Sequence, residues 1–143
     1  VLARKARDVS FASGCCLLIP SSFFTEHGLL DESYFLYYED AELCLRAAAS
    51  GYVIHYVPEA IVWHKVSSST GGEDSDLSIY YGTRNRLRVL RQYRFPWYAL
   101  CFVLLTRLIK GMKGVYSRKW RLVFVGIWDW LRGQTGLMPV GKG

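Results

Sequence analysis

Two adjacent carboxylates, Glu39 and Asp40, are the residues of this chain best suited to catalysis. They follow Tyr37 and Tyr38 and open a segment rich in alanine and leucine, a pattern that places acids in the first turn of a helix. A carboxylate in that position can accept a proton from a hydroxyl group. Position alone is explained equally well by acids that cap a helix, so the surrounding residues must decide between the two interpretations.

Three residues further along the chain could bind a ligand. His64 ends an aromatic and β-branched segment and could hold a metal ion, although a lone histidine at the end of a strand is usually structural. Arg84 and Asn85 could reach phosphate oxygens, because a guanidinium group forks onto such oxygens. An arginine stripe that faces solvent or lipid explains them equally well. Arg46 lies further along the same predicted helix as the carboxylates, and we expect it to fix packing by pairing with an acid.

The secondary structure around these residues can be predicted from the period of the hydrophobic residues and from the turn residues. We expect buried or extended strands at residues 9–20, 34–38, 52–57 and 60–64, and helices at 21–27, 39–50 and 76–94. A flexible loop is expected at 67–72. Residues 97–109 form an apolar run that is shorter than the roughly 20 residues of a membrane-spanning helix, so they should lie in a membrane interface or in a core.

The charge divides the chain into two halves. Residues 1–76 hold five Lys and Arg against eleven Asp and Glu, whereas residues 77–143 hold thirteen Lys and Arg and a single acid, Asp129. The acidic half could host a metal or a general base, and the basic half could meet an anionic surface such as lipid or nucleic acid. A hydrophobic fraction of 51% excludes a disordered chain.

The four cysteines show neither zinc-site spacing nor the density of a disulfide scaffold. They predict reduced, mostly buried thiols and therefore a cytoplasmic compartment. A secretory leader is not evident at the start of the chain.

Several motifs, in order, resemble the signature of family 2 glycosyltransferases. The first is the run D-E-x-x-F-x-x-Y-E-D-x-x-L-x-x-R at residues 31–46. The others are Ser13-Gly14, Gly51-Tyr52, Pro58, His64, Tyr80-Tyr81-x-x-Arg84-Asn85 and Gly126-Ile127-Trp128-Asp129-x-x-x-Gly133. The last is similar to a terminal motif of rhamnosyltransferase-like and galactofuranosyltransferase-like members. The resemblance covers about residues 9–136.

This resemblance implies an α/β fold class: the C-terminal half of a GT-A mixed sheet flanked by helices, followed by a basic amphipathic helical tail. Residues 1–72 would be the catalytic part. In residues 73–143, basic residues interleaved with aromatic ones predict a membrane-associating tail. The nucleotide-binding half, with its D-x-D motif, would precede residue 1, so the chain alone is expected to be inactive.

The resemblance also implies an inverting enzyme in which Asp40 is the general base and Glu39 helps to orient the acceptor. A divalent cation, Mn²⁺ or Mg²⁺, would be held mostly by the preceding half, with His64 as a ligand. The donor would be a nucleotide-diphosphate sugar, and the acceptor a lipid-linked or cell-surface polysaccharide of a bacterium. The reduced cysteines and the basic aromatic tail predict that the enzyme lies at the cytoplasmic face of the membrane, on anionic lipid.

Two alternatives remain open. The basic aromatic half could be a non-catalytic membrane- or nucleic-acid-binding module, although no nucleic-acid motif supports a nucleic-acid partner and none is expected. The domain could also be a degenerate transferase that only scaffolds other proteins.

Overall fold

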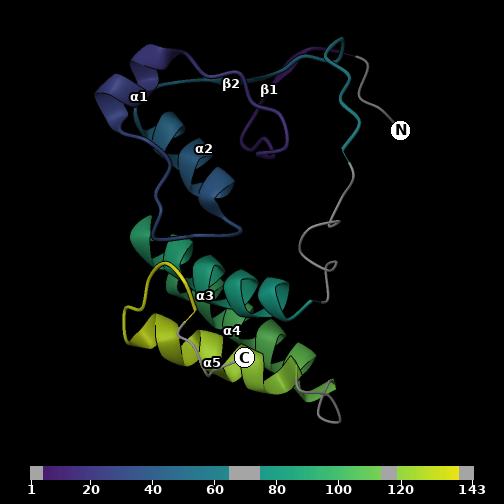
Figure 1. Ribbon diagram of the computed structural model, residues 1–143, viewed down its shortest axis with the longest axis vertical. Helices are drawn as coiled ribbons and strands as arrows, with labels where there is room; N and C mark the ends of the chain where they lie inside the picture. The colour runs from purple at the N-terminus through teal and green to yellow at the C-terminus, as the bar shows by residue number, and fades with distance from the viewer. Residues whose placement is uncertain (1–4, 65–74, 114–118, 139–143) are drawn as a thin grey trace. The chain divides into compact units, whose positions relative to one another are not determined.

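The chain folds into two compact units, the first made of residues 1–31 and 39–65, the second of residues 32–38 and 66–143 (Figure 1). The computed structural model describes residues 5–64, 75–113 and 119–138. The elements within these ranges are, in order, β1 (Arg7–Val9), α1 (Ser21–His27), α2 (Glu39–Ala49), β2 (Ile54–Tyr56), α3 (Asp76–Gln92), α4 (Trp97–Lys113) and α5 (Lys119–Leu131). This helix-rich chain with a small sheet is consistent with part of a GT-A domain. The predicted boundary at residue 72 and the predicted loop at 67–72 lie outside the described residues.

The sheet of the first unit has two antiparallel strands, with Arg7 opposite Tyr56 and Val9 opposite Ile54. Asp8 and His55 face each other across it, with 2.9 Å between Oδ1 and Nδ1. The strand predicted at 52–57 is therefore confirmed in its central part. The one predicted at 60–64 is wrong, because these residues form an irregular, exposed segment after Pro58.

The strand predicted at residues 9–20 is also wrong. Only Val9 lies in a strand, and Leu18 is fully exposed. A strand buried on both faces needs hydrogen-bonded neighbours, whereas β1 pairs only with β2 among the described residues. The segment also carries Cys15 and Cys16, which are exposed.

The cysteines are all free, but most are not buried as the sequence predicted. Cys101 is exposed as well, and Cys44 alone is buried. The Cys44 sulfur lies 3.5 Å from both the amide nitrogen and the carbonyl oxygen of Ala12. Burial raises the pKa of this thiol, a shift that the Ala12 backbone partly offsets, so it packs as a small apolar group.

The helices predicted at 21–27 and 39–50 are confirmed as α1 and α2. Gly28 and Gly51 follow them with φ of 82°, a left-handed conformation that glycine adopts without steric cost. Phe23, the buried residue of α1, packs edge-on against the ring of Tyr52.

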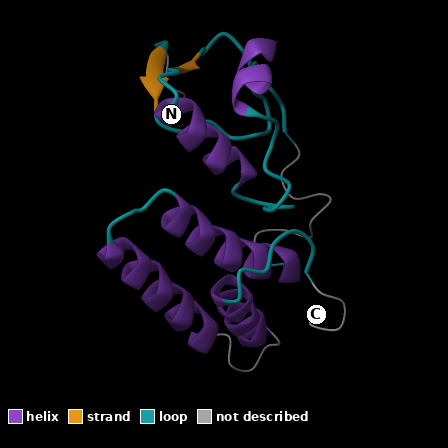
Figure 2. Ribbon diagram, turned by 90° about the vertical axis from the view of Figure 1, so that its left-hand side faces the viewer, coloured by secondary structure: helices purple, strands orange, loops and turns teal. Residues whose placement is uncertain are grey.

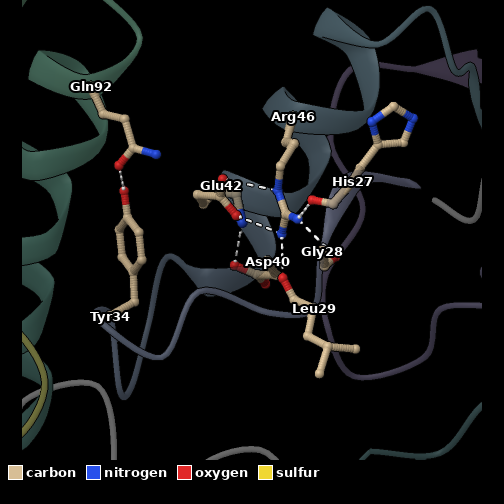
Figure 3. A network of polar contacts seen from close by, with 9 residues as sticks. His27, Gly28, Leu29, Tyr34, Asp40, Glu42, Arg46 and Gln92 are labelled. Carbon is tan, nitrogen blue, oxygen red and sulfur yellow. Dashed lines mark hydrogen bonds and ion pairs between the residues drawn. The ribbon is translucent and has the colours of Figure 1, made fainter. Parts of the chain in front are cut away.

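Arg46 ties α2 to the chain that follows α1, as Figure 3 shows. Its guanidinium group forks onto both carboxylate oxygens of Glu42 at 3.1 Å. It also donates to the carbonyl oxygens of His27, Gly28 and Leu29 at 2.6, 2.9 and 2.8 Å. The prediction that Arg46 fixes packing by pairing with an acid is confirmed. The Arg46–Glu42 ion pair thus stabilises the helix whose first turn contains Glu39 and Asp40.

The second unit contains α3, α4 and α5, which pack against one another (Figure 2). The predicted helix at 76–94 is confirmed as α3, and the apolar run at 97–109 is the main part of α4. Ile79 of α3 packs on Leu122 and Val123 of α5. Gly126 lets the two helices approach closely, because a Cβ there would lie 3.0 Å from the carbonyl oxygen of Tyr80.

A buried hydrogen bond joins the same two helices. The Tyr80 hydroxyl donates to Asp129 Oδ2 at 2.8 Å. Burial, together with Asp129, raises the pKa of Tyr80 to about 12, so the phenol stays protonated. The Gly-Ile-Trp-Asp motif thus supplies both the close approach and the acceptor that fasten α5 to α3.

Within the described ranges, we find no helix with both the length and the apolar character that crossing a bilayer requires.

We expect Arg46→Lys to lower the free energy of unfolding by about 2–3 kcal/mol, because an ammonium group cannot fork onto Glu42 and reach three carbonyl oxygens at once. Arg7→Lys, at an exposed position, is the matched control and should change it by less than about 0.5 kcal/mol. Urea unfolding of the two variants measures the difference. Equal midpoints would show that the Arg46 contacts do not stabilise the unit.

Candidate active site

Asp40 lies in the first turn of α2 with both carboxylate oxygens engaged by backbone amides. The amide of Gly14 donates to Oδ2 at 3.0 Å, and that of Ala41 donates to Oδ1 at 2.8 Å. Each carboxylate oxygen can accept more than one hydrogen bond, so capacity remains for a substrate hydroxyl. The side chain is partly exposed. Asp40 is therefore oriented by the backbone while it stays accessible.

Gly14 supplies the close approach on which this orientation depends. A Cβ at position 14 would lie 3.3 Å from Asp40 Cβ, which is tighter than ordinary packing. The sequence pointed to Ser13-Gly14 only as part of a motif and gave Gly14 no role. The missed signal is that a glycine in an otherwise apolar segment often marks a close backbone contact.

Glu39 has a different environment from its neighbour. It is half-buried, and its Oε2 is a buried atom with no hydrogen-bond partner among the described residues. Burial raises the pKa of Glu39, with a smaller contribution from the charge of Asp40, while a backbone hydrogen bond acts in the opposite direction. Two adjacent carboxyl groups in unlike environments can take different roles in acid–base chemistry.

His64 does not share a described contact with the acidic pair. It lies exposed in the irregular segment that replaces the predicted strand at 60–64. Within residues 5–64, 75–113 and 119–138, no three His, Cys, Asp or Glu side chains converge as a metal site would require. The described residues do not form a metal centre by themselves, and ligation by His64 stays a prediction.

Asn85 lies in α3 and is fully buried. The two N–H groups of its Nδ2 are shared among the carbonyl oxygens of Tyr34, Leu36 and Tyr37, which lie at 2.8, 2.8 and 2.9 Å. Three carbonyl oxygens around one nitrogen fix the amide orientation, because the amide oxygen would repel them. Asn85 thus holds the backbone of the segment that ends just before Glu39 in sequence.

Arg84 is buried beside Asn85 and has an acceptor for each of its five N–H groups. Its Nε donates to Asn85 Oδ1 at 2.9 Å. One terminal nitrogen donates to the Tyr80 hydroxyl at 3.5 Å and to the Gly136 carbonyl oxygen at 2.8 Å. The other donates to the carbonyl oxygens of Ser33 at 3.4 Å and Tyr34 at 3.2 Å. Phosphate binding by Arg84 and Asn85 stays a prediction. It would require these donors to leave their present acceptors.

The segment that Arg84 and Asn85 hold is not the extended strand predicted at 34–38. Phe35, Tyr37 and Tyr38 have φ of 60°, 63° and 71°. Left-handed backbone is unfavourable for aromatic residues and persists only where other contacts enforce it. The Tyr34 hydroxyl adds one such contact by donating to Gln92 Oε1 at 2.9 Å (Figure 3). Alternating aromatic residues predict a strand, and the sequence carries no glycine that would have signalled this loop.

Glu39→Gln tests the raised pKa. The native state of the wild type holds a proton on Glu39 to higher pH than the unfolded chain does, so stability falls as pH rises from the ordinary pKa of 4.5 through the raised one. The glutamine variant lacks this loss. The melting temperature of Glu39→Gln minus that of the wild type should therefore increase as pH rises through this range, and stay constant at higher pH. Glu59→Gln, at an exposed acid, is the control, and parallel profiles for Glu39→Gln and wild type would contradict the prediction.

Asn85→Asp tests the contacts to the aromatic segment. The substitution keeps the shape but turns an acceptor oxygen toward three carbonyl oxygens, and we expect it to lower the free energy of unfolding by about 3 kcal/mol or more. Arg91→Gln, an exposed change on the same helix, should alter it by less than about 0.5 kcal/mol. Denaturant unfolding monitored by tyrosine and tryptophan fluorescence measures both. A loss for Asn85→Asp no larger than for the control would show that Asn85 does not hold the segment.

Comparison with known proteins places these residues in a family. The model of glycosyltransferase-like family 2 matches residues 1–91, which include the acidic pair and the Arg84-Asn85 pair. No solved structure gives a significant match.

Three relatives illustrate the similarity. The N-acetylglucosaminyl-diphospho-decaprenol L-rhamnosyltransferase of Mycobacterium tuberculosis is 45% identical over 70 residues, which are 49% of this chain and 23% of the relative. The low-salt glycan biosynthesis hexosyltransferase Agl10 of Haloferax volcanii is 32% identical over 80 residues, 56% of this chain and 26% of the relative. The rhamnosyltransferase WbbL of Escherichia coli is 40% identical over 50 residues, 35% of this chain and 19% of the relative.

The chain therefore spans about a quarter of the length of these relatives. The family match, by contrast, covers most of the chain and contains the Tyr38-Glu39-Asp40 run and the Tyr-Tyr-x-x-Arg-Asn helix. The chain belongs to glycosyltransferase-like family 2, and parts of it are similar to rhamnosyltransferases.

Proposed function

We propose that this chain carries the general-base segment of an inverting glycosyltransferase, with Asp40 as the base. The observation that supports this is the Asp40 carboxylate, which two backbone amides orient while its side chain stays accessible. In the reaction, an acceptor hydroxyl gives its proton to Asp40 as its oxygen bonds to the anomeric carbon of the sugar. The bond from that carbon to the diphosphate breaks on the opposite face, and the diphosphate leaves with the electron pair.

Glu39 is proposed to orient the acceptor. Its raised pKa and unpartnered buried oxygen give it a greater tendency to hold a proton than an exposed glutamate has. A protonated carboxyl group can donate a hydrogen bond to a sugar oxygen, and an ionised one can only accept. Asp40, one residue on, is then the group that receives the acceptor proton.

The proposed donor is a nucleotide-diphosphate sugar, and the proposed acceptor is a lipid-linked or cell-surface polysaccharide. The names of the relatives support this choice of acceptor: one is a diphospho-decaprenol rhamnosyltransferase and another a glycan biosynthesis hexosyltransferase. A divalent cation would neutralise the departing diphosphate. His64 is a candidate ligand for it, and the rest of the enzyme would supply the remaining ligands.

Asp40→Asn in the full-length enzyme that contains this segment is the direct test. Loss of a general base should reduce the transfer rate by about 10²–10⁴-fold, whereas donor affinity should change little because the base contacts the acceptor. Glu59→Gln removes an exposed acid outside the proposed site and serves as the control. Transfer kinetics with purified acceptor, together with donor titration, separate the two effects. Wild-type turnover by Asp40→Asn would end the proposal.

A further inference from the structure

Helix α4 carries a stripe of large apolar side chains on its exposed side. Tyr98, Phe102, Leu105 and Ile109 are between 40% and 63% exposed, and their spacing of four, three and four residues aligns them along one face. Val103, on another face of the helix, is buried. The helix therefore uses one side for the core of the second unit and leaves another apolar side uncovered.

Helix α5 repeats this arrangement. Trp120, Phe124, Trp128 and Leu131 are between 40% and 57% exposed, with spacings of four, four and three residues. Leu122, Val123 and Asp129 face the core instead. We call the two stripes together the α4–α5 apolar surface. Scattered exposed apolar residues are normal in proteins, but two regular stripes on neighbouring helices indicate a surface that binds something.

This part of the chain carries a positive net charge. Residues 77–143 contain thirteen Lys and Arg, and their only acid, Asp129, is buried. Arg121 and Arg132 are exposed next to the α5 stripe, and the Arg132 guanidinium lies 4.6 Å from the ring centroid of Trp128. The exposed side of α5 thus combines apolar rings with cations and presents no carboxylate.

We propose that the α4–α5 apolar surface lies on an anionic lipid bilayer. Tryptophan and tyrosine rings favour the boundary between acyl chains and headgroups, and exposed arginines attract anionic headgroups. An interface with a second protein explains the aromatic rings but not the absence of acids. The proposal extends the proposed function, since an enzyme held at the bilayer meets a lipid-linked acceptor directly, but binding does not depend on catalysis.

Vesicle flotation tests the apolar part. The chain should float with vesicles of phosphatidylcholine and phosphatidylglycerol, and a Phe102→Gln, Phe124→Gln double variant should lose about tenfold or more of its partition coefficient. The matched control is Leu18→Gln with Leu137→Gln, which removes two exposed apolar side chains outside the stripes. Circular dichroism checks that both variants are folded. Equal flotation of the two double variants would overturn the proposal.

The electrostatic part needs a second pair of variants. Arg121→Gln with Arg132→Gln should weaken flotation, whereas Lys5→Gln with Arg7→Gln, exposed in the first unit, should not. Vesicles of phosphatidylcholine alone and raised salt should weaken binding of the wild type. Binding indifferent to phosphatidylglycerol would overturn the proposal. Binding of the wild type to RNA but not to vesicles would also overturn it. So would self-association that the Phe102→Gln, Phe124→Gln double variant abolishes, if the wild type does not bind vesicles.

The two proposals fail separately. Asp40→Asn should float like the wild type, because Asp40 lies outside the α4–α5 apolar surface. A catalytically active enzyme that does not bind vesicles would refute only the membrane proposal. Vesicle binding with unchanged transfer by Asp40→Asn would remove only the general-base proposal.

Discussion

The second unit depends on two neighbouring polar side chains buried in α3. Arg84 and Asn85 hydrogen-bond each other and direct most of their other donors at backbone oxygens of residues 33–37 and of Gly136. A buried guanidinium is destabilising unless each of its N–H groups has an acceptor, and here each one does. The same donors remove the penalty of burying backbone carbonyl groups in a loop without regular structure. The same hydrogen bonds therefore satisfy both the buried guanidinium group and the buried backbone carbonyl groups.

This arrangement also explains how three aromatic residues keep an unfavourable backbone. Phe35, Tyr37 and Tyr38 adopt positive φ because the carbonyl oxygens around them are held. In the first unit, Arg46 likewise holds backbone carbonyl groups. It donates to three consecutive carbonyl oxygens at the end of α1. Arginine suits both places, since its planar fork offers several donors in fixed directions.

The family motif accordingly combines residues of different kinds. Asp40 is oriented and accessible, and Glu39 is half-buried with a raised pKa, which suits the acid–base roles proposed for them. Arg46, Arg84, Asn85 and Asp129 make buried or partly buried contacts within the fold. A motif that identifies an enzyme family can thus consist largely of residues that hold the backbone around a few reactive groups.

Features that depend on neighbours in the chain could be predicted from the sequence: the helices that became α1, α2 and α3, the glycines that end the first two, and the acidic pair at the start of α2. The family motifs predicted the membership that comparison confirmed. Three features required contacts between distant parts of the chain: the loop at 34–38, the exposure of most of residues 10–18 and the burial of Arg84. The reason is distance along the chain. Asn85 and its acceptors are 48 to 51 residues apart, so no local pattern of aromatic residues could reveal that their carbonyl oxygens would be held in a left-handed loop.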